Sequence, residues 1–85
     1  MIHMVLQYPL LTEKAVGMIE KENKIVFIID DNATKKQVKD EVEKLYAVKV
    51  ASVNTIVGIK GNKKAYVKLK KEFKATDLAT KLKIL

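Results

Sequence analysis

The sequence predicts an α+β fold, in which a small antiparallel four-stranded sheet is packed against helices. Segments with strand and helix periodicity follow one another in the order β-α-β-α-β-β-α. The last two strands are joined only by Gly58–Lys63, a short turn that predicts a hairpin and therefore an antiparallel sheet. Since 85 residues suffice for one modest core, we expect a single domain over residues 1–85.

A short strand and a helix are expected first. Residues 5–11 are mostly apolar around Pro9, and proline is tolerated only in an edge strand or at a strand end. Thr12 can then cap a helix that reaches about Lys21 and is ended by Glu22-Asn23. Helical spacing places three residues on its buried face: Ala15, Val16 and Ile19.

The next strand and helix are predicted by two different patterns. Residues 24–30 contain a continuous run of apolar β-formers, which is typical of a central strand covered on both faces. Thr34 and Gln37 form a capping box at the start of a helix that runs from Lys35 to about Ala47. Three of its residues are expected in the core: Val38, Val42 and Leu45.

Another strand and a final helix are expected in the C-terminal half. Alternation over residues 49–59 predicts one face made of Ala51, Val53, Thr55, Val57 and Ile59. The opposite face would hold Val50, Ser52, Asn54 and Ile56. After Phe73, Thr76 can cap a short helix that packs Leu78, Ala79 and Leu82.

Residues 63–70 hold the most informative pattern. Every second residue is apolar, and the residues between form an exposed row: Lys64, Tyr66, Lys68 and Lys70. Ammonium groups about 7 Å apart on one strand face repel one another at physiological salt. RNA phosphates would neutralise this row, and the tyrosine ring could contact a sugar or base. A solvated strand face is the alternative interpretation.

The charge is distributed unevenly along the chain. Residues 1–48 hold 7 lysines and 8 acids, whereas residues 49–85 hold 10 lysines and 2 acids, and the net charge is +7. Such a one-sided basic surface is typical of nucleic-acid binders. All cations are lysine, so phosphate contact and shape should dominate over the bidentate base recognition that arginine provides. A thermophilic bias toward lysine and glutamate is the competing explanation.

Four motifs in order resemble the universal large-subunit ribosomal protein twenty-three family. They are Pro9 with Thr12–Ala15, Ala33–Lys35, Val53–Thr55, and Lys63–Lys70 followed by Leu78. The resemblance implies a strand order of 1-2-4-3 and a structural, non-enzymatic role beside the polypeptide exit tunnel. It also implies large-subunit rRNA and neighbouring large-subunit ribosomal proteins as partners, no cofactor, and a docking surface for factors such as the signal recognition particle.

Two departures from bacterial members favour the archaeal branch of this family. Bacterial members carry a long hairpin extension that lines the tunnel, whereas Gly58–Lys63 is a minimal turn. Bacterial members also have an aromatic-acid pair that they use with trigger factor, and here Tyr46-Ala47 stands in its place. Neither tunnel lining nor trigger-factor binding is therefore implied.

The expected rRNA contacts combine charge with position. Lysines at a helix start attract anions beside free N–H groups, and a hairpin tip can enter a groove. A mid-strand asparagine could bind a sugar or base, or equally satisfy a neighbouring loop. The candidates are Lys14, Lys35, Lys36, Asn54, Lys60, Lys63, Lys64, Tyr66, Lys68 and Lys70. The resemblance adds Glu13 as a factor-docking residue, although helix capping is its simpler role.

Nothing in the sequence indicates catalysis or a resident metal. His3 is the only histidine, and Asp30-Asp31 more simply serves a turn than a Mg²⁺ ion. There is no phosphate loop, Ser-His-Asp set or cysteine, and no run long enough for a membrane helix. The first residues lack the features of a secretory signal, which predicts a cytoplasmic protein. The resemblance implies that this protein is bound to the ribosome and has no small-molecule substrate.

Two other functions remain as hypotheses. A free-standing RNA- or DNA-binding chaperone would use the same basic face. A small ferredoxin-like enzyme of the acylphosphatase kind needs an arginine in an anion-binding loop, and this chain has no arginine.

Overall fold

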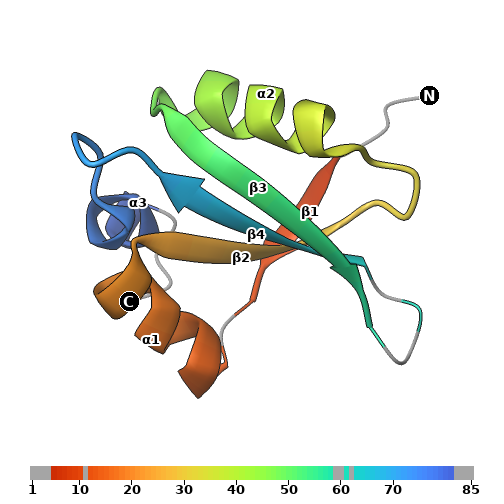
Figure 1. Ribbon diagram of the computed structural model, residues 1–85, viewed down its shortest axis with the longest axis horizontal. Helices are drawn as coiled ribbons and strands as arrows, with labels where there is room; N and C mark the ends of the chain where they lie inside the picture. Colours follow the sequence, from red (N-terminus) through yellow and green to blue (C-terminus); the bar gives the residue numbers. More distant parts are fainter. Residues whose placement is uncertain (1–4, 11, 59–60, 62, 82–85) are drawn as a thin grey trace.

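Four strands and three helices make up the part of the chain that the computed structural model describes, residues 5–10, 12–58, 61 and 63–81. They are β1 (Leu6–Pro9), α1 (Glu13–Glu22), β2 (Lys24–Ile29), α2 (Lys35–Tyr46), β3 (Val50–Val57), β4 (Lys63–Leu69) and α3 (Ala75–Lys81). The strands form an antiparallel sheet in the order β1-β2-β4-β3 (Figure 1). The predicted fold class and strand order are confirmed. Of the predicted core and strand residues, Ile59 and Leu82 lie outside the described residues.

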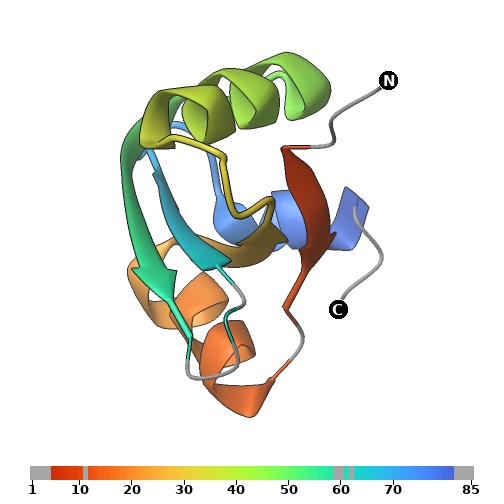
Figure 2. The same cartoon turned by 90° about the vertical axis from the view of Figure 1, so that its right-hand side faces the viewer.

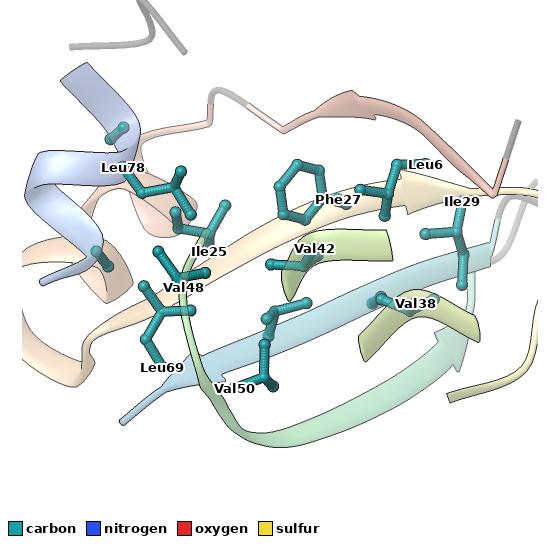
Figure 3. Close-up of a cluster of buried hydrophobic side chains, with 14 of the residues drawn as sticks. Leu6, Ile25, Phe27, Ile29, Val38, Val42, Val48, Val50, Leu69 and Leu78 are labelled. Carbon is teal, nitrogen blue, oxygen red and sulfur yellow. The ribbon is translucent and has the colours of Figure 1, made fainter. Parts of the chain in front are cut away.

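One face of the sheet, here called the core face, carries the main hydrophobic core. β2 contributes Ile25, Phe27 and Ile29, and β4 contributes the alternate residues of its predicted buried row. α2 and α3 cover this face with Val38, Val42 and Leu78, each at most 2% exposed (Figure 3). Burial of this apolar surface is the main stabilising term of such a small domain.

The opposite face, here called the outer face, is partly covered by α1. In both views of the chain, α2 lies above the sheet strands and α1 lies below them (Figures 1 and 2). Val26 and Ile28 belong to the outer face and are 2% and 4% exposed, while Ala15 of α1 is also buried. The prediction that the apolar run at residues 24–30 is covered on both faces is therefore confirmed.

A β-bulge near the start of β3 corrects the predicted alternation there. Val50 pairs with Leu69 on the core face, although we expected it on the same side as Ser52 and Asn54. The register shifts between Val50 and Ser52, so Ala51 is an extra residue in the ladder. Residues on either side of a bulge change face relative to a regular strand. From Ser52 onward the predicted alternation holds.

The predicted core position of Leu45 is also wrong, because its side chain is 58% exposed. The inner positions of α2 recur every four residues, at Val38, Val42 and Tyr46, and the neighbouring Leu45 is turned away by about 100°. The Tyr46 ring stacks on Phe27 with centroids 6.4 Å apart, and burial raises the pKa of its hydroxyl. On α1, Val16 is only partly buried, in contrast to Ala15 and Ile19.

The start of α3 is determined by a residue far away in the sequence. Thr76 is not the cap that we expected, because the helix begins at Ala75 and the Lys74 carbonyl accepts from Leu78 N–H at 3.3 Å. The N–H of Ala75 donates to the side-chain oxygen Oδ1 of Asn23 at 2.6 Å. Any polar group that lies within reach can cap a helix, including one from a distant part of the chain. The local sequence therefore predicted the wrong capping residue.

Asn23 thus joins the end of α1 to the connection between β4 and α3. It ends α1 in the left-handed conformation, with φ 57°, which asparagine tolerates better than most residues. Its amide nitrogen Nδ2 donates to the carbonyls of Leu69 and Phe73 at 3.2 and 2.9 Å. These bonds fix the end of α1 relative to the end of β4.

Candidate nucleic-acid interface

The outer face is organised as three rows that run across β2, β4 and β3. Directly opposed residues of antiparallel strands share a face, so the register gives each row. The rows are Lys24–Lys68–Ser52, Val26–Tyr66–Asn54 and Ile28–Lys64–Ile56. A tyrosine at the centre thus has an amide on one side and a lysine above and below.

Three of the predicted contact residues on β4 and one on β3 are brought together here. Tyr66 and Lys64 are partly exposed, and Lys68 and Asn54 are exposed. Asn54 lies directly opposite Tyr66, so its amide and the phenol ring lie on one surface. The described residues form one ion pair, in which Lys24 Nζ lies 3.5 Å from Glu22 Oε1 at one end of this face. Lys64 and Lys68 thus have no carboxylate partner in the described part of the chain.

Lys14 joins this group from the start of α1. Together with Ala15 and Met18 it lines a hollow of about 140 Å³, whose other wall includes Val26, Lys64 and Tyr66. Thr12 also lines the hollow and caps α1, where its Oγ1 accepts from Ala15 N–H at 3.2 Å. Residues fifty positions apart in the sequence thereby form one concave site.

Lys63 lies apart from the outer face. The register pairs it with Ile29 and Val57 on the core face. Its ammonium Nζ donates to the Ala33 carbonyl at 2.9 Å, in the turn that precedes α2. This lysine therefore holds two segments of the protein together.

The candidates on α2 also lie away from Tyr66. Lys35 and Lys36 are exposed in the first turn of α2, which packs on the core face. The capping box of Thr34 and Gln37 is formed there, with bonds of 2.9 and 3.2 Å. Two backbone N–H groups at this end are thus already satisfied, and the lysines are the main attraction for an anion.

Lys70 and Glu13 are exposed at two other places. Lys70 follows β4, and its N–H donates to the Lys49 carbonyl at 3.0 Å. Glu13 begins α1 next to Lys14. Lys60 lies outside the described residues.

Glu43 lies near Lys70 and has a structural partner. Its Oε2 accepts from the Val50 N–H at 2.9 Å, and this bond joins α2 to the start of β3. That bond is the main reason why the pKa of Glu43 lies below its ordinary value of 4.5. Burial opposes it, and the charges of Lys39, Lys49 and Lys70 each lower the pKa by a smaller amount.

Lys24, Ser52 and Ile56 also lie on the outer face and were not among the predicted contact residues. Lys24 was assigned only to the end of a buried strand, and its place beside Lys68 depends on the pairing of β2 with β4. Ile56 is 52% exposed and adds an apolar side chain to this surface. The alternation within residues 49–59 predicts the face on which Ile56 lies, but not that it lies in one row with Lys64 and Ile28.

Within residues 5–10, 12–58, 61 and 63–81, no three His, Cys, Asp or Glu side chains are grouped so that they could hold a metal ion. No described helix has the length and apolar character needed to span a membrane.

Comparison with known proteins identifies a family and a relative that each match most of the chain. The sequence model of a family described as "Ribosomal protein L23" matches residues 4–78. A protein of Pyrobaculum aerophilum described as "Large ribosomal subunit protein uL23" is 59% identical over 75 residues. This alignment covers 88% of the present chain and 93% of that relative.

Proposed function

Because the chain belongs to the ribosomal protein L23 family, we propose that it is a structural constituent of the large ribosomal subunit that binds large-subunit rRNA through its outer face. The family is structural and not enzymatic, in agreement with the prediction from sequence. The 59% identity to an archaeal protein agrees with the predicted archaeal type. We place the protein on cytoplasmic ribosomes, near the polypeptide exit tunnel and beside other large-subunit proteins.

The arrangement of Lys64, Tyr66, Lys68 and Asn54 on one surface carries this proposal. The two lysines have no intramolecular carboxylate partner within the described residues, so their charges are available to phosphates. Neutralising phosphates releases condensed counterions, which favours binding at low and moderate salt. The ring and amide between them can contact sugars and bases. No turnover is involved.

The remaining candidates lie outside this group of four residues. Lys35 and Lys36 lie on α2, and Lys63 lies at the start of β4, on the core-face side of the sheet. Lys70 follows β4 and lies near Glu43. Lys14 lies on α1, beside Tyr66. We propose Lys14, Lys35, Lys36 and Lys70, with Lys60, as contacts in an rRNA environment that surrounds more than one side of the domain, whereas the Lys63 ammonium is used by its bond to the Ala33 carbonyl.

A charge-reversal experiment tests the proposal. The double substitution Lys64→Glu with Lys68→Glu should abolish incorporation into large subunits, because it places two anions against phosphates. Circular dichroism should show that the domain stays folded, because both side chains point away from the core. The matched control is Lys39→Glu with Lys44→Glu, which changes the charge equally on exposed positions of α2.

Incorporation is measured by co-sedimentation with large subunits after a moderate salt wash. Wild-type incorporation by the Lys64/Lys68 variant would contradict the assigned surface. If the wild-type protein itself washed off the subunits, a free-standing RNA or DNA chaperone would replace the ribosomal role.

We further propose that Glu13 helps to dock factors that meet the nascent chain, with the signal recognition particle as the first candidate. Its side chain is exposed at the start of α1, next to the proposed RNA surface. Glu13→Ala should weaken binding of the particle to ribosomes and leave incorporation into subunits unchanged. Unchanged binding of the particle would refute this role.

A further inference from the structure

We propose that the hollow between α1 and β4 holds a single unstacked RNA nucleotide, with its base against the Tyr66 ring and a phosphate beside Lys14 and Lys64. This inference rests on the proposed function, because it names what one part of the rRNA does at the outer face. It assigns one nucleotide to a defined position on that face.

The walls of the hollow differ in chemistry. Val26, Met18 and Ala15 give it an apolar inner side, and the Tyr66 ring forms part of one wall. Lys14 comes from α1 and Lys64 from β4, so a lysine side chain contributes to each wall. None of the described residues that line the hollow is acidic. An apolar slot flanked by cations suits a flat ring that is attached to a phosphate.

The size of the hollow favours one base over a larger ligand. Its volume is about 140 Å³, whereas sites for drug-sized molecules and cofactors occupy about 300–1,000 Å³. Sequence-specific RNA recognition commonly uses bases that are splayed out of a helix and stacked on an aromatic side chain. Stacking also tolerates any base, so the site does not require the arginine that this protein lacks.

Polar groups at the site can orient the nucleotide. Thr12 Oγ1 already accepts the Ala15 N–H, so its hydroxyl hydrogen remains free to donate. Asn54 is exposed and lies directly opposite Tyr66, where its amide can reach a base edge or a ribose hydroxyl. The two walls are held in place by the Asn23 bonds to the carbonyls of Leu69 and Phe73.

The test compares Tyr66→Leu, Tyr66→Phe and Tyr8→Leu in assembled large subunits. Tyr8 is the matched control, because it is also a tyrosine of the outer face, is 53% exposed, and does not line the hollow. Reagents that modify the Watson–Crick edges of bases are applied to subunits that contain each variant. Ultraviolet cross-linking of wild-type subunits, followed by mass spectrometry, identifies the peptide bonded to RNA.

We expect Tyr66→Leu to change the reactivity of one nucleotide, or of two adjacent ones, by about tenfold, because stacking on the ring is lost. Tyr66→Phe should resemble the wild type, since it keeps the ring, and Tyr8→Leu should change nothing at that nucleotide. The cross-link should attach this same nucleotide to the peptide around Tyr66 or around Lys14.

Three results would overturn the inference: an unchanged reactivity pattern in Tyr66→Leu subunits, an equal defect in Tyr66→Phe, or a cross-link that maps elsewhere. In each of these the variants still enter subunits, so the proposed function stands. Failure of the wild-type protein to enter subunits would instead refute the proposed function.

Discussion

Lys63 and Lys64 are adjacent in the sequence and belong to opposite faces of β4. On the core face, Lys63 donates to the Ala33 carbonyl at 2.9 Å and stabilises the turn before α2. On the outer face, Lys64 lines the hollow beside Tyr66 and has no carboxylate partner among the described residues. The same residue type thus contributes to folding on one face and is available to a ligand on the other.

This comparison shows that a run of lysines cannot be interpreted as one binding site. The side a lysine occupies on its strand decides whether its charge is already used. A double substitution of Lys63 and Lys64 would therefore mix a folding defect with a binding defect. Separate substitutions on the two faces distinguish these effects.

The largest contrast should come from Leu69 and Lys68, which lie next to each other on opposite faces of β4. Leu69 is 2% exposed, so Leu69→Ala should lower the free energy of unfolding by about 3 kcal/mol through lost burial and a cavity. Lys68→Ala should change it by less than about 0.5 kcal/mol, because the side chain is exposed. Urea denaturation measures both, and equal losses would contradict the assignment of faces.

A smaller stability contrast is expected between Lys63→Met and Lys64→Met. Lys63→Met leaves the buried Ala33 carbonyl without its donor, which should cost about 1 kcal/mol. In a domain of this size that corresponds to a fall in Tm of about 4–8 °C. Lys64→Met should leave Tm nearly unchanged. A Tm that falls equally in both variants would show that the Lys63 bond contributes nothing specific.

In RNA binding, by contrast, Lys64→Met should have a larger effect than Lys63→Met. Lys64→Met removes one phosphate contact, so the slope of log Kd against log salt should fall by about 0.7–0.9. Lys63→Met should keep the wild-type slope, provided that the protein is folded at the temperature used. A large-subunit rRNA transcript is the probe. If only Lys63→Met reduced the slope, the RNA would bind on the side of the sheet that carries Lys63, and the outer face would not be the binding surface.

The smallest effect concerns Glu43, which links α2 to β3 and lies near Lys70. Its pKa is lowered in the folded protein, so its contribution to stability is present above its ordinary value of 4.5 and is lost as the pH falls through the folded value. Glu43→Gln should therefore lower the urea midpoint at pH 7 and reduce the further loss on acidification to pH 3. Glu20→Gln removes an exposed carboxylate on α1 and serves as the control. Identical acid profiles of the two variants would exclude a specific role for the Val50 N–H bond.

The errors in the sequence-based prediction of the fold have a common cause. Leu45 and Val50 were assigned to the wrong face because the end of α2 and the bulge at Ala51 depend on packing between elements. Thr76 was taken for a cap because the true capping side chain, Asn23, is 52 positions from Ala75. Local patterns predict elements well and say little about contacts that are made across the fold.

For the candidate site, the sequence predicted the row of β4 but not its surroundings. The alternation in residues 63–70 identified Lys64, Tyr66 and Lys68 as one exposed row. Lys24 and the hollow beside Lys14 depend on strand register and on where α1 packs. Neither can be derived from the spacing of residues along the chain.

The sequence alone determined the order of strands and helices, the basic face of β4, and the motifs that lead to the family. Periodicity and composition are local properties, and they follow directly from which residues occupy alternate positions. Only the tertiary structure decided that Lys63 serves the fold while Lys64 faces the proposed ligand, and that α1 and β4 enclose a hollow. Those outcomes depend on which distant segments meet when the core is buried, because burial, and not the chain order, selects the neighbours of each side chain.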